Sequence, residues 1–337
     1  MVLTSLVAIL PVVSFLLLLI LFDSFKLVPT STFVRALVSG VLAAIAASLL
    51  HAGLFAAFHL DAQTLARYVA PVTEEALKMV FVLWALFRRQ IGFLVDAAIV
   101  GFAIGAGFAV VENIEYLRHL PDQAIWLWIV RGFGTAILHA LTTAVIAIGA
   151  KAALDRRPER PWLAVIPPWM GAVLLHSAFN HALVSPLLAA AMVMFVLPLV
   201  VLAVFTVSEQ NTREWVGAGL DLDMELLQLV KSSEFSGTRF GRYLGELRSR
   251  FPGPVVADMF CLLQLDLELA IRAKGMLMAR EAGLIVPVDD ALRARLAERA
   301  YLEKTIGRTG LLALRPLQVT SDFDRWHRHL LEGTGKR

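Results

Sequence analysis

Long apolar stretches fill the first part of the sequence, and a mixed polar and apolar pattern fills the rest. Seven of the apolar stretches are long enough for a helix that crosses a bilayer core of about 30 Å. They lie at residues 3–22, 33–58, 71–87, 92–117, 126–150, 162–183 and 184–207. Beyond residue 207, apolar residues recur at helical spacing, as in residues 259–278. The pattern predicts an all-α protein with a bundle of about seven transmembrane helices in residues 1–207 and a helical domain of unknown role in residues 208–337.

The composition agrees with a membrane protein. Hydrophobic residues make up 58% of the chain and charged residues 18%, and the mean hydropathy is +0.70. Soluble domains average about 45–50% apolar and about 25% charged residues. The single cysteine, Cys261, excludes an intrachain disulfide framework and a cysteine zinc site. The net charge of +3 is too small to indicate a nucleic-acid partner, so the expected partners are the lipid bilayer and other proteins.

The distribution of Lys and Arg predicts the orientation, because basic side chains resist translocation across the membrane. The loops that follow the first, third and fifth stretches, taken with the first residues of the second stretch, contain eight basic residues. They are Lys26, Arg35, Arg88, Arg89, Lys151, Arg156, Arg157 and Arg160. The alternate loops contain only Arg67 and Arg118, with Arg131 slightly inside the fifth stretch. We therefore expect a multi-pass protein of the cell membrane with its N-terminus outside and its C-terminal domain in the cytoplasm.

Several ionisable residues interrupt the apolar stretches, although each costs on the order of 2.5–3.5 kcal/mol at mid-membrane. They occur in four short motifs on four predicted helices. The motifs are Glu74-Glu75-Ala-Leu-Lys78, Phe108-Ala-Val-Val-Glu112-Asn113, His139-Ala-Leu-Thr-Thr143 and His176-Ser-Ala-Phe-Asn180. The predicted topology places all four motifs at similar depth, in the outer half of the membrane. We expect them to form one site, with Gly101 and Gly105 letting another helix approach closely.

The residue types in these motifs suit acid and base catalysis on water. One carboxylate can take a proton from water while another group protonates a leaving amine. Asn180 or a histidine can donate a hydrogen bond to a developing oxyanion. Residues four apart share a helical face, so Glu74 is expected to face Lys78. The chemistry favours hydrolysis, with a peptide bond as the favoured target.

The four motifs, in this order and spacing, resemble those of the PrsW family of glutamic-type intramembrane proteases, within the superfamily of the CAAX prenyl endopeptidases. The resemblance covers about residues 65–207. The family pattern is Glu-Glu-x-x-Lys, Phe-x-x-x-Glu-Asn, His-x-x-x-Thr or Ser, and His-x-x-x-Asn. The resemblance implies an endopeptidase that needs no cofactor and cuts a membrane-anchored protein. In some members that substrate is an anti-sigma factor, cut on its extracytoplasmic side.

The resemblance also implies a role for each motif residue. Glu74 is the favoured water-activating base, and Glu75 is its neighbour or a structural partner. Four further residues orient water and stabilise the intermediate: Glu112, His139, His176 and Asn180. Three residues support them: Lys78, Asn113 and Thr143.

Several alternatives remain open from the sequence. Glu112, His139 and His176 are an acceptable zinc ligand set with Glu74 as base, although the HExxH spacing is absent. A proton-coupled transporter would also place Glu and His inside the membrane, but the internal repeats typical of transporters are missing. A catalytically inactive scaffold is a third possibility. His51 and His181 lie in none of the motifs and are interpreted as structural.

Overall fold

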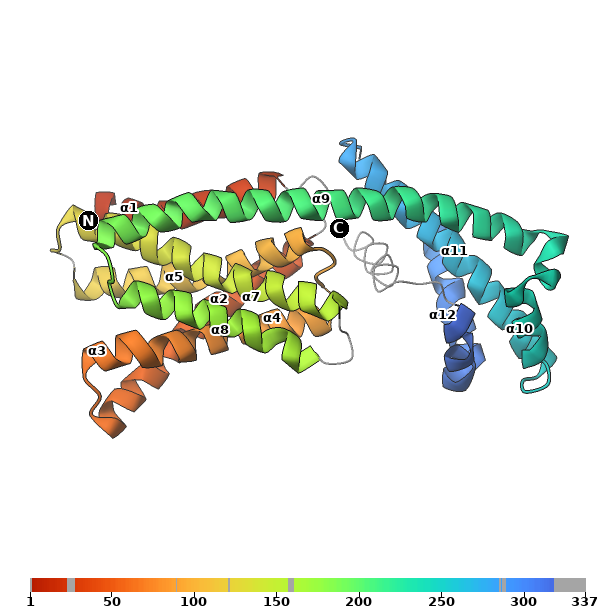
Figure 1. The fold of residues 1–337 in the computed structure, drawn as a ribbon, viewed down its shortest axis with the longest axis horizontal. Helices are drawn as coiled ribbons and strands as arrows, with labels where there is room; N and C mark the ends of the chain where they lie inside the picture. The colour runs from red at the N-terminus through yellow and green to blue at the C-terminus, as the bar shows by residue number, and fades with distance from the viewer. Residues whose placement is uncertain are drawn as a thin grey trace. The chain divides into compact units, whose positions relative to one another are not determined.

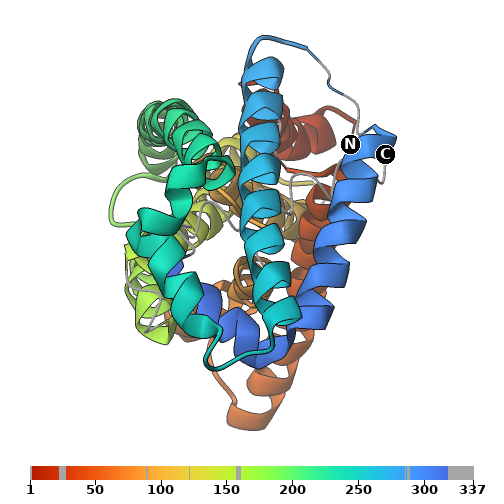
Figure 2. The ribbon, with the colours of Figure 1, turned by 90° about the vertical axis from the view of Figure 1, so that its right-hand side faces the viewer.

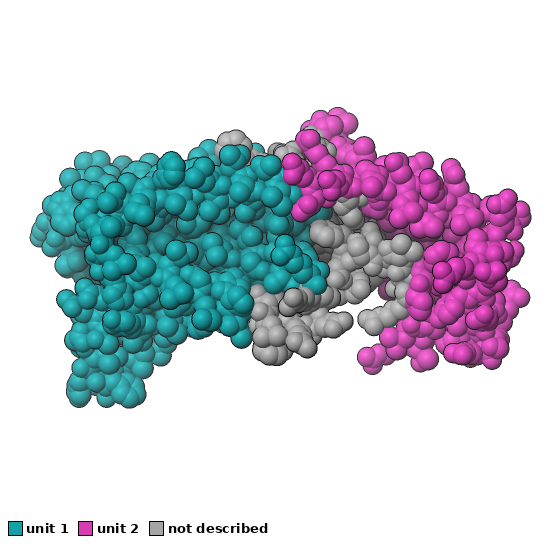
Figure 3. Space-filling model, in the orientation of Figure 1, with its two compact units in different colours: residues 1–209 teal, residues 210–337 magenta. Residues whose placement is uncertain are grey.

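Helices make up nearly all of the chain that the computed structural model describes, which is residues 2–22, 28–88, 90–120, 122–156, 161–284, 286 and 289–317. The chain divides into two compact units, Met1–Glu209 and Gln210–Arg337 (Figure 3). The predicted all-α membrane bundle is confirmed. Four basic residues that carried the orientation argument, Lys26, Arg89, Arg157 and Arg160, fall outside the described residues.

The first unit contains a helix at each predicted apolar stretch (Figure 1). Its elements are α1 (Val2–Phe22), α2 (Thr30–Phe58), α3 (Ala62–Thr64), the π-helix η1 (Leu65–Val69), α4 (Ala70–Phe87), α5 (Leu94–His119), α6 (Ile125–Ile129), the π-helix η2 (Val130–Thr135), α7 (Ala136–Arg156), α8 (Pro161–Asn180) and the first half of α9 (Pro186–Lys231). The N-terminus, α3 and the start of α9 lie at one end of this unit, on the left in Figure 1.

Five of the described helical segments are long and apolar enough to cross a membrane: α1, α2, α5, the continuous helix from α6 to α7, and α9. Helix α4 is excluded from this set because it carries three charged residues, Glu74, Glu75 and Lys78. Seven spans therefore stay a prediction. The seventh was expected to end at residue 207, but α9 continues without a break to Lys231.

Helix α5 forms the centre of the first unit, and its residues from Asp96 to Ala109 are all buried. Glycines let neighbouring helices approach its backbone. A Cβ atom on Gly105 would overlap the α7 backbone at His139 and Ala140, and one on Gly107 would overlap Leu37 of α2. The predicted close approach is therefore confirmed. By contrast, α1, α2 and α9 expose large apolar side chains, as expected for helices that face lipid.

The second unit consists of the end of α9, the 3-10 helix η3 (Ser233–Gly237), α10 (Arg239–Leu247), α11 (Gly253–Glu281), α12 (Asp290–Leu314) and the 3-10 helix η4 (Arg315–Leu317). Helices α11 and α12 lie side by side (Figures 1 and 2). Residues 259–278, where the sequence shows helical spacing, lie within α11. The buried face of α11 includes Met259, Leu262 and Leu265, and α12 contributes Leu302 and Ile306 to the buried core.

Candidate active site

A cavity of about 490 Å³ lies in the first unit and is lined by residues of α2, α3, η1, α4, α5, η2, α7 and α8. Five residues that the sequence singled out line it: Glu74, Glu112, His139, His176 and Asn180. The other predicted residues, Glu75, Lys78, Asn113 and Thr143, are buried behind the wall. The four motifs therefore meet around one cavity.

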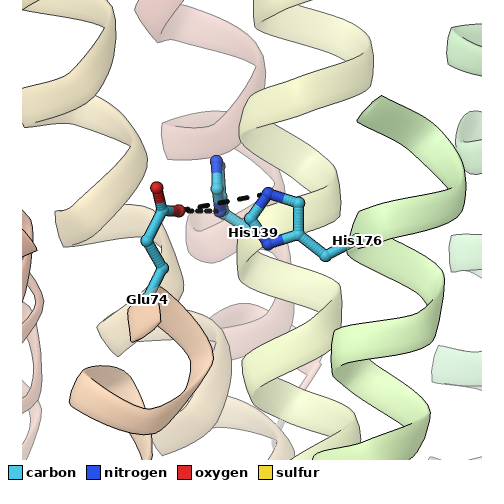
Figure 4. Close-up of side chains that lie close together, drawn as sticks. All are labelled: Glu74, His139 and His176. Carbon is cyan, nitrogen blue, oxygen red and sulfur yellow. Dashed lines mark ion pairs between the residues drawn. The ribbon is translucent and has the colours of Figure 1, made fainter. Parts of the chain in front are cut away.

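Glu74, His139 and His176 point toward one another from α4, α7 and α8 (Figure 4). The Glu74 Oε2 atom lies 3.9 Å from His139 Nδ1 and 4.0 Å from His176 Nε2. It is buried and has no hydrogen-bond partner. His51 approaches from α2, with Nδ1 4.0 Å from Glu74 Oε1 and Nε2 2.8 Å from the Thr73 hydroxyl. His51 therefore borders the site, although the sequence suggested only a structural role.

Glu75 is fully buried, and one of its oxygens joins three helices. Glu75 Oε1 accepts hydrogen bonds from Lys78 Nζ at 2.6 Å, His176 Nδ1 at 2.9 Å and Thr142 Oγ1 at 3.1 Å. Because His176 donates through Nδ1, its Nε2 carries the lone pair that faces Glu74. Glu75 therefore fixes both the orientation and the tautomer of His176.

Lys78 pairs with Glu75 three residues away, whereas Glu74, four residues away, is directed at His139 and His176. Its ammonium also donates to His139 Nδ1 at 3.2 Å and lies 4.8 Å from the centre of the Phe108 ring. His139 therefore carries its proton on Nε2, which lies 2.9 Å from Glu112 Oε2. Lys78 thus links α4 to α7 through His139, and to α8 through Glu75, which binds His176.

Arg131 is a buried residue of the site that the sequence did not identify as functional. Its Nη2 atom lies 3.2 Å from Glu112 Oε2, and its Nε donates to Asn113 Oδ1 at 2.9 Å. Asn113 in turn donates to the Ala8 carbonyl of α1 at 2.7 Å. Arg131 lies in η2, and π-turns are frequent at functional sites. Only the position of Arg131 inside an apolar stretch could have indicated it.

The remaining motif residues form local contacts. Asn180 Nδ2 donates to the Ala66 carbonyl at 2.8 Å, which ties α8 to η1. Thr143 donates to the His139 carbonyl at 2.9 Å, whereas its neighbour Thr142 reaches Glu75. Spacing could not distinguish these two threonines, because both lie within one turn of His139.

Glu74, His139 and His176 have the spacing of a metal site, since one donor atom of each lies within 4.8 Å of the others. Glu and two His form a known catalytic zinc set, and Glu75 holds His176 as a carboxylate often holds a zinc ligand. The lone pair of His139 Nδ1, however, accepts a hydrogen bond from the Lys78 ammonium. The positively charged ammonium repels a metal ion at this distance. Its hydrogen bond also uses the lone pair through which His139 Nδ1 would bind the metal. The residues therefore do not fit a metal in this arrangement.

Comparison with protein families gives one match. The family model described as "PrsW family intramembrane metalloprotease" matches residues 28–207, which is more than half of the chain. This range contains all four motifs. Neither the curated proteins nor the solved structures contain a match to the chain.

Proposed function

The chain belongs to the PrsW family of intramembrane proteases, and we propose that it hydrolyses a peptide bond of a membrane-anchored protein with water activated by Glu74. Family membership makes the protein a membrane-embedded peptide hydrolase that acts on membrane proteins in a lipid environment. The observation that carries the proposal is the convergence of Glu74, His139 and His176 on one cavity.

The contacts of the two adjacent glutamates favour Glu74 as the base. Glu74 lines the cavity, and its Oε2 lacks a hydrogen-bond partner, so it is available to a water molecule. Glu75 Oε2 also lacks a partner, but Glu75 is fully buried outside the cavity lining, and its Oε1 already accepts three hydrogen bonds. We therefore assign proton transfer to Glu74 and the positioning of His176 to Glu75.

The proton transfers of the proposed reaction use Glu74 and water. Water placed between Glu74 Oε2 and His176 Nε2 gives a proton to Glu74 as its oxygen attacks the peptide carbonyl carbon. The carbonyl π electrons move to the oxygen, which becomes an oxyanion. When the intermediate collapses, the C–N bond breaks and Glu74 passes its proton to the leaving amine. His139, held by Lys78 and Glu112, forms the adjacent wall.

The family description names a metalloprotease, and this is the main alternative to a glutamate mechanism. The Lys78 ammonium beside His139 Nδ1 supports the mechanism without a metal. We expect protein purified in detergent to keep its cleavage activity and to contain no stoichiometric zinc after chelator treatment. Cleavage that is lost with the chelator and restored by zinc would overturn this part of the proposal.

We propose that the cavity lies toward the extracytoplasmic face, with the N-terminus outside and the second unit in the cytoplasm. Cys261 is exposed, and it is the only cysteine, so it reports on the second unit without engineering. It should react with a membrane-impermeant maleimide only after permeabilisation. With Cys261→Ser as background, Asp122→Cys should label in intact cells. The reverse pattern would invert the topology.

The substrate can be identified from the protein that accumulates uncut. Cells that produce the Glu74→Gln variant should retain a full-length membrane-anchored protein that is shortened in wild-type cells. An anti-sigma factor is the candidate that the family resemblance suggests. The control is Glu225→Gln, an exposed glutamate of the second unit. Identical sets of membrane-protein fragments in all three strains would reject the proposed function.

A further inference from the structure

Two of the predicted donors for the oxyanion are engaged elsewhere. Asn180 Nδ2 donates to the Ala66 carbonyl at 2.8 Å. His176 donates through Nδ1 to Glu75, and because neutral imidazole has a single N–H group, it retains no donor for the substrate. Two buried donor atoms of cavity-lining residues lack a hydrogen-bond partner, His139 Nε2 and Arg131 Nη2, and both lie beside Glu112 Oε2. Of these two groups, the guanidinium carries a full positive charge.

Arg131 lines the same cavity and has a buried donor atom without a hydrogen-bond partner, Nη2. Nη2 lies 3.2 Å from Glu112 Oε2, but the geometry is not that of a hydrogen bond. The guanidinium group is fixed on two other sides. Its Nε donates to Asn113 at 2.9 Å, and its Cζ lies 3.5 Å from the centre of the Tyr116 ring. Arg131 is thus a rigid, permanently charged donor.

We propose that Arg131 is a catalytic residue whose Nη2 donates a hydrogen bond to the oxyanion formed when water attacks the peptide carbonyl. This inference rests on the proposed function, in which Glu74 activates that water. A fixed donor aimed at developing charge stabilises the transition state more than the bound substrate. Glu112 offsets the charge of Arg131 before the substrate binds, and Asn113 links the guanidinium to α1 through the Ala8 carbonyl.

The test uses purified protein in proteoliposomes and the peptide sequence that the wild type cuts. Two numbers are compared: kcat/KM for that peptide, and the inhibition constant of the same peptide with a phosphinate in place of the scissile amide. The phosphinate is tetrahedral and anionic like the intermediate. Arg131→Gln should lower kcat by about 10²- to 10³-fold, as loss of one oxyanion donor does, with KM nearly unchanged. The inhibition constant should rise by the same factor as kcat/KM falls.

Arg118→Gln is the matched control, because Arg118 is exposed on α5 and does not line the cavity. It should leave both numbers unchanged. If Arg131→Gln does not fold, the same two measurements are made on Arg131→Lys, since lysine keeps the charge but not the planar donor group. Arg131→Lys should weaken phosphinate binding and turnover together.

Two results would overturn the inference while leaving the proposed function intact. One is full activity of Arg131→Gln. The other is lower kcat with unchanged phosphinate affinity in Arg131→Gln or Arg131→Lys, which would make Arg131 a positioning residue. The proposed function itself fails if the wild type does not cut the peptide or if Glu74→Gln cuts it normally.

Discussion

Both units bury charged side chains, but the arrangement of the partners around those side chains differs between the units. In the second unit, Lys274 pairs with Asp223 at 2.8 Å, and Arg299 pairs with Asp266 at 2.5 Å and Glu303 at 2.8 Å. In the first unit, the charged groups converge from several helices on one cavity. Among the described residues, every buried side-chain polar atom without a hydrogen-bond partner belongs to the first unit, including Glu74 Oε2 and Arg131 Nη2.

This contrast separates structural charges from charges available for chemistry. Closed pairs such as Lys274 with Asp223 join helices. An unpaired buried polar atom costs about 1–3 kcal/mol. The first unit accepts that cost at Glu74 and Arg131, which face the same cavity. The comparison predicts that substitutions of buried charged residues lower the stability of either unit. Only the substitutions in the first unit should also reduce cleavage.

The largest effect is expected for Lys78→Met. This substitution leaves the fully buried Glu75 without its counter-ion, which costs about 3–5 kcal/mol when one partner of a buried pair is removed. It also frees His139 Nδ1. Thermal unfolding in detergent should show the lower stability, and cleavage should be lost. A variant that unfolds and cuts like the wild type would contradict the role assigned to Lys78.

Gly105→Ala should have the next largest effect. The new methyl group would overlap the α7 backbone at His139, and overpacking of this kind costs about 1–3 kcal/mol. We expect a lower unfolding temperature and reduced kcat, because α7 carries His139. The control is Gly275→Ala in α11, where a Cβ atom meets nothing within 4 Å. That substitution should stabilise the second unit by up to about 1 kcal/mol.

Lys274→Met tests the closed pairs of the second unit. Asp223 keeps some solvent exposure, so loss of its partner should cost about 2 kcal/mol, less than the loss at Lys78. Unfolding of the second unit should shift to lower temperature in differential scanning calorimetry. Cleavage by the folded protein should stay at the wild-type rate. Loss of cleavage without unfolding would show that the second unit takes part in the reaction.

Much of the fold was predictable because hydrophobic length and periodicity report on membrane helices directly. The motif residues were predictable because charges inside such helices are rare. The continuation of α9 to Lys231 was not, since a change in composition does not end a helix.

The sequence predicted which residues form the site better than it predicted the contacts between them. Residues three and four apart both share a helical face, so the sequence could not distinguish Glu75 from Glu74 as the partner of Lys78. The π-helices were also unexpected, and they change which side chains face inward. Arg131 lies in η2 and reaches Glu112 and Asn113 of α5, a contact that no spacing rule predicts.

The most direct test of the central claim is single-turnover cleavage by purified Glu74→Gln in proteoliposomes, beside wild type and Glu225→Gln. Glutamine keeps the size of the side chain but cannot accept a proton from water at neutral pH. The rate of Glu74→Gln should fall by about 10²- to 10⁴-fold, the usual contribution of a general base, with an unchanged unfolding temperature. Cleavage by Glu74→Gln at the rate of Glu225→Gln would contradict the assignment of Glu74 as the group that activates water.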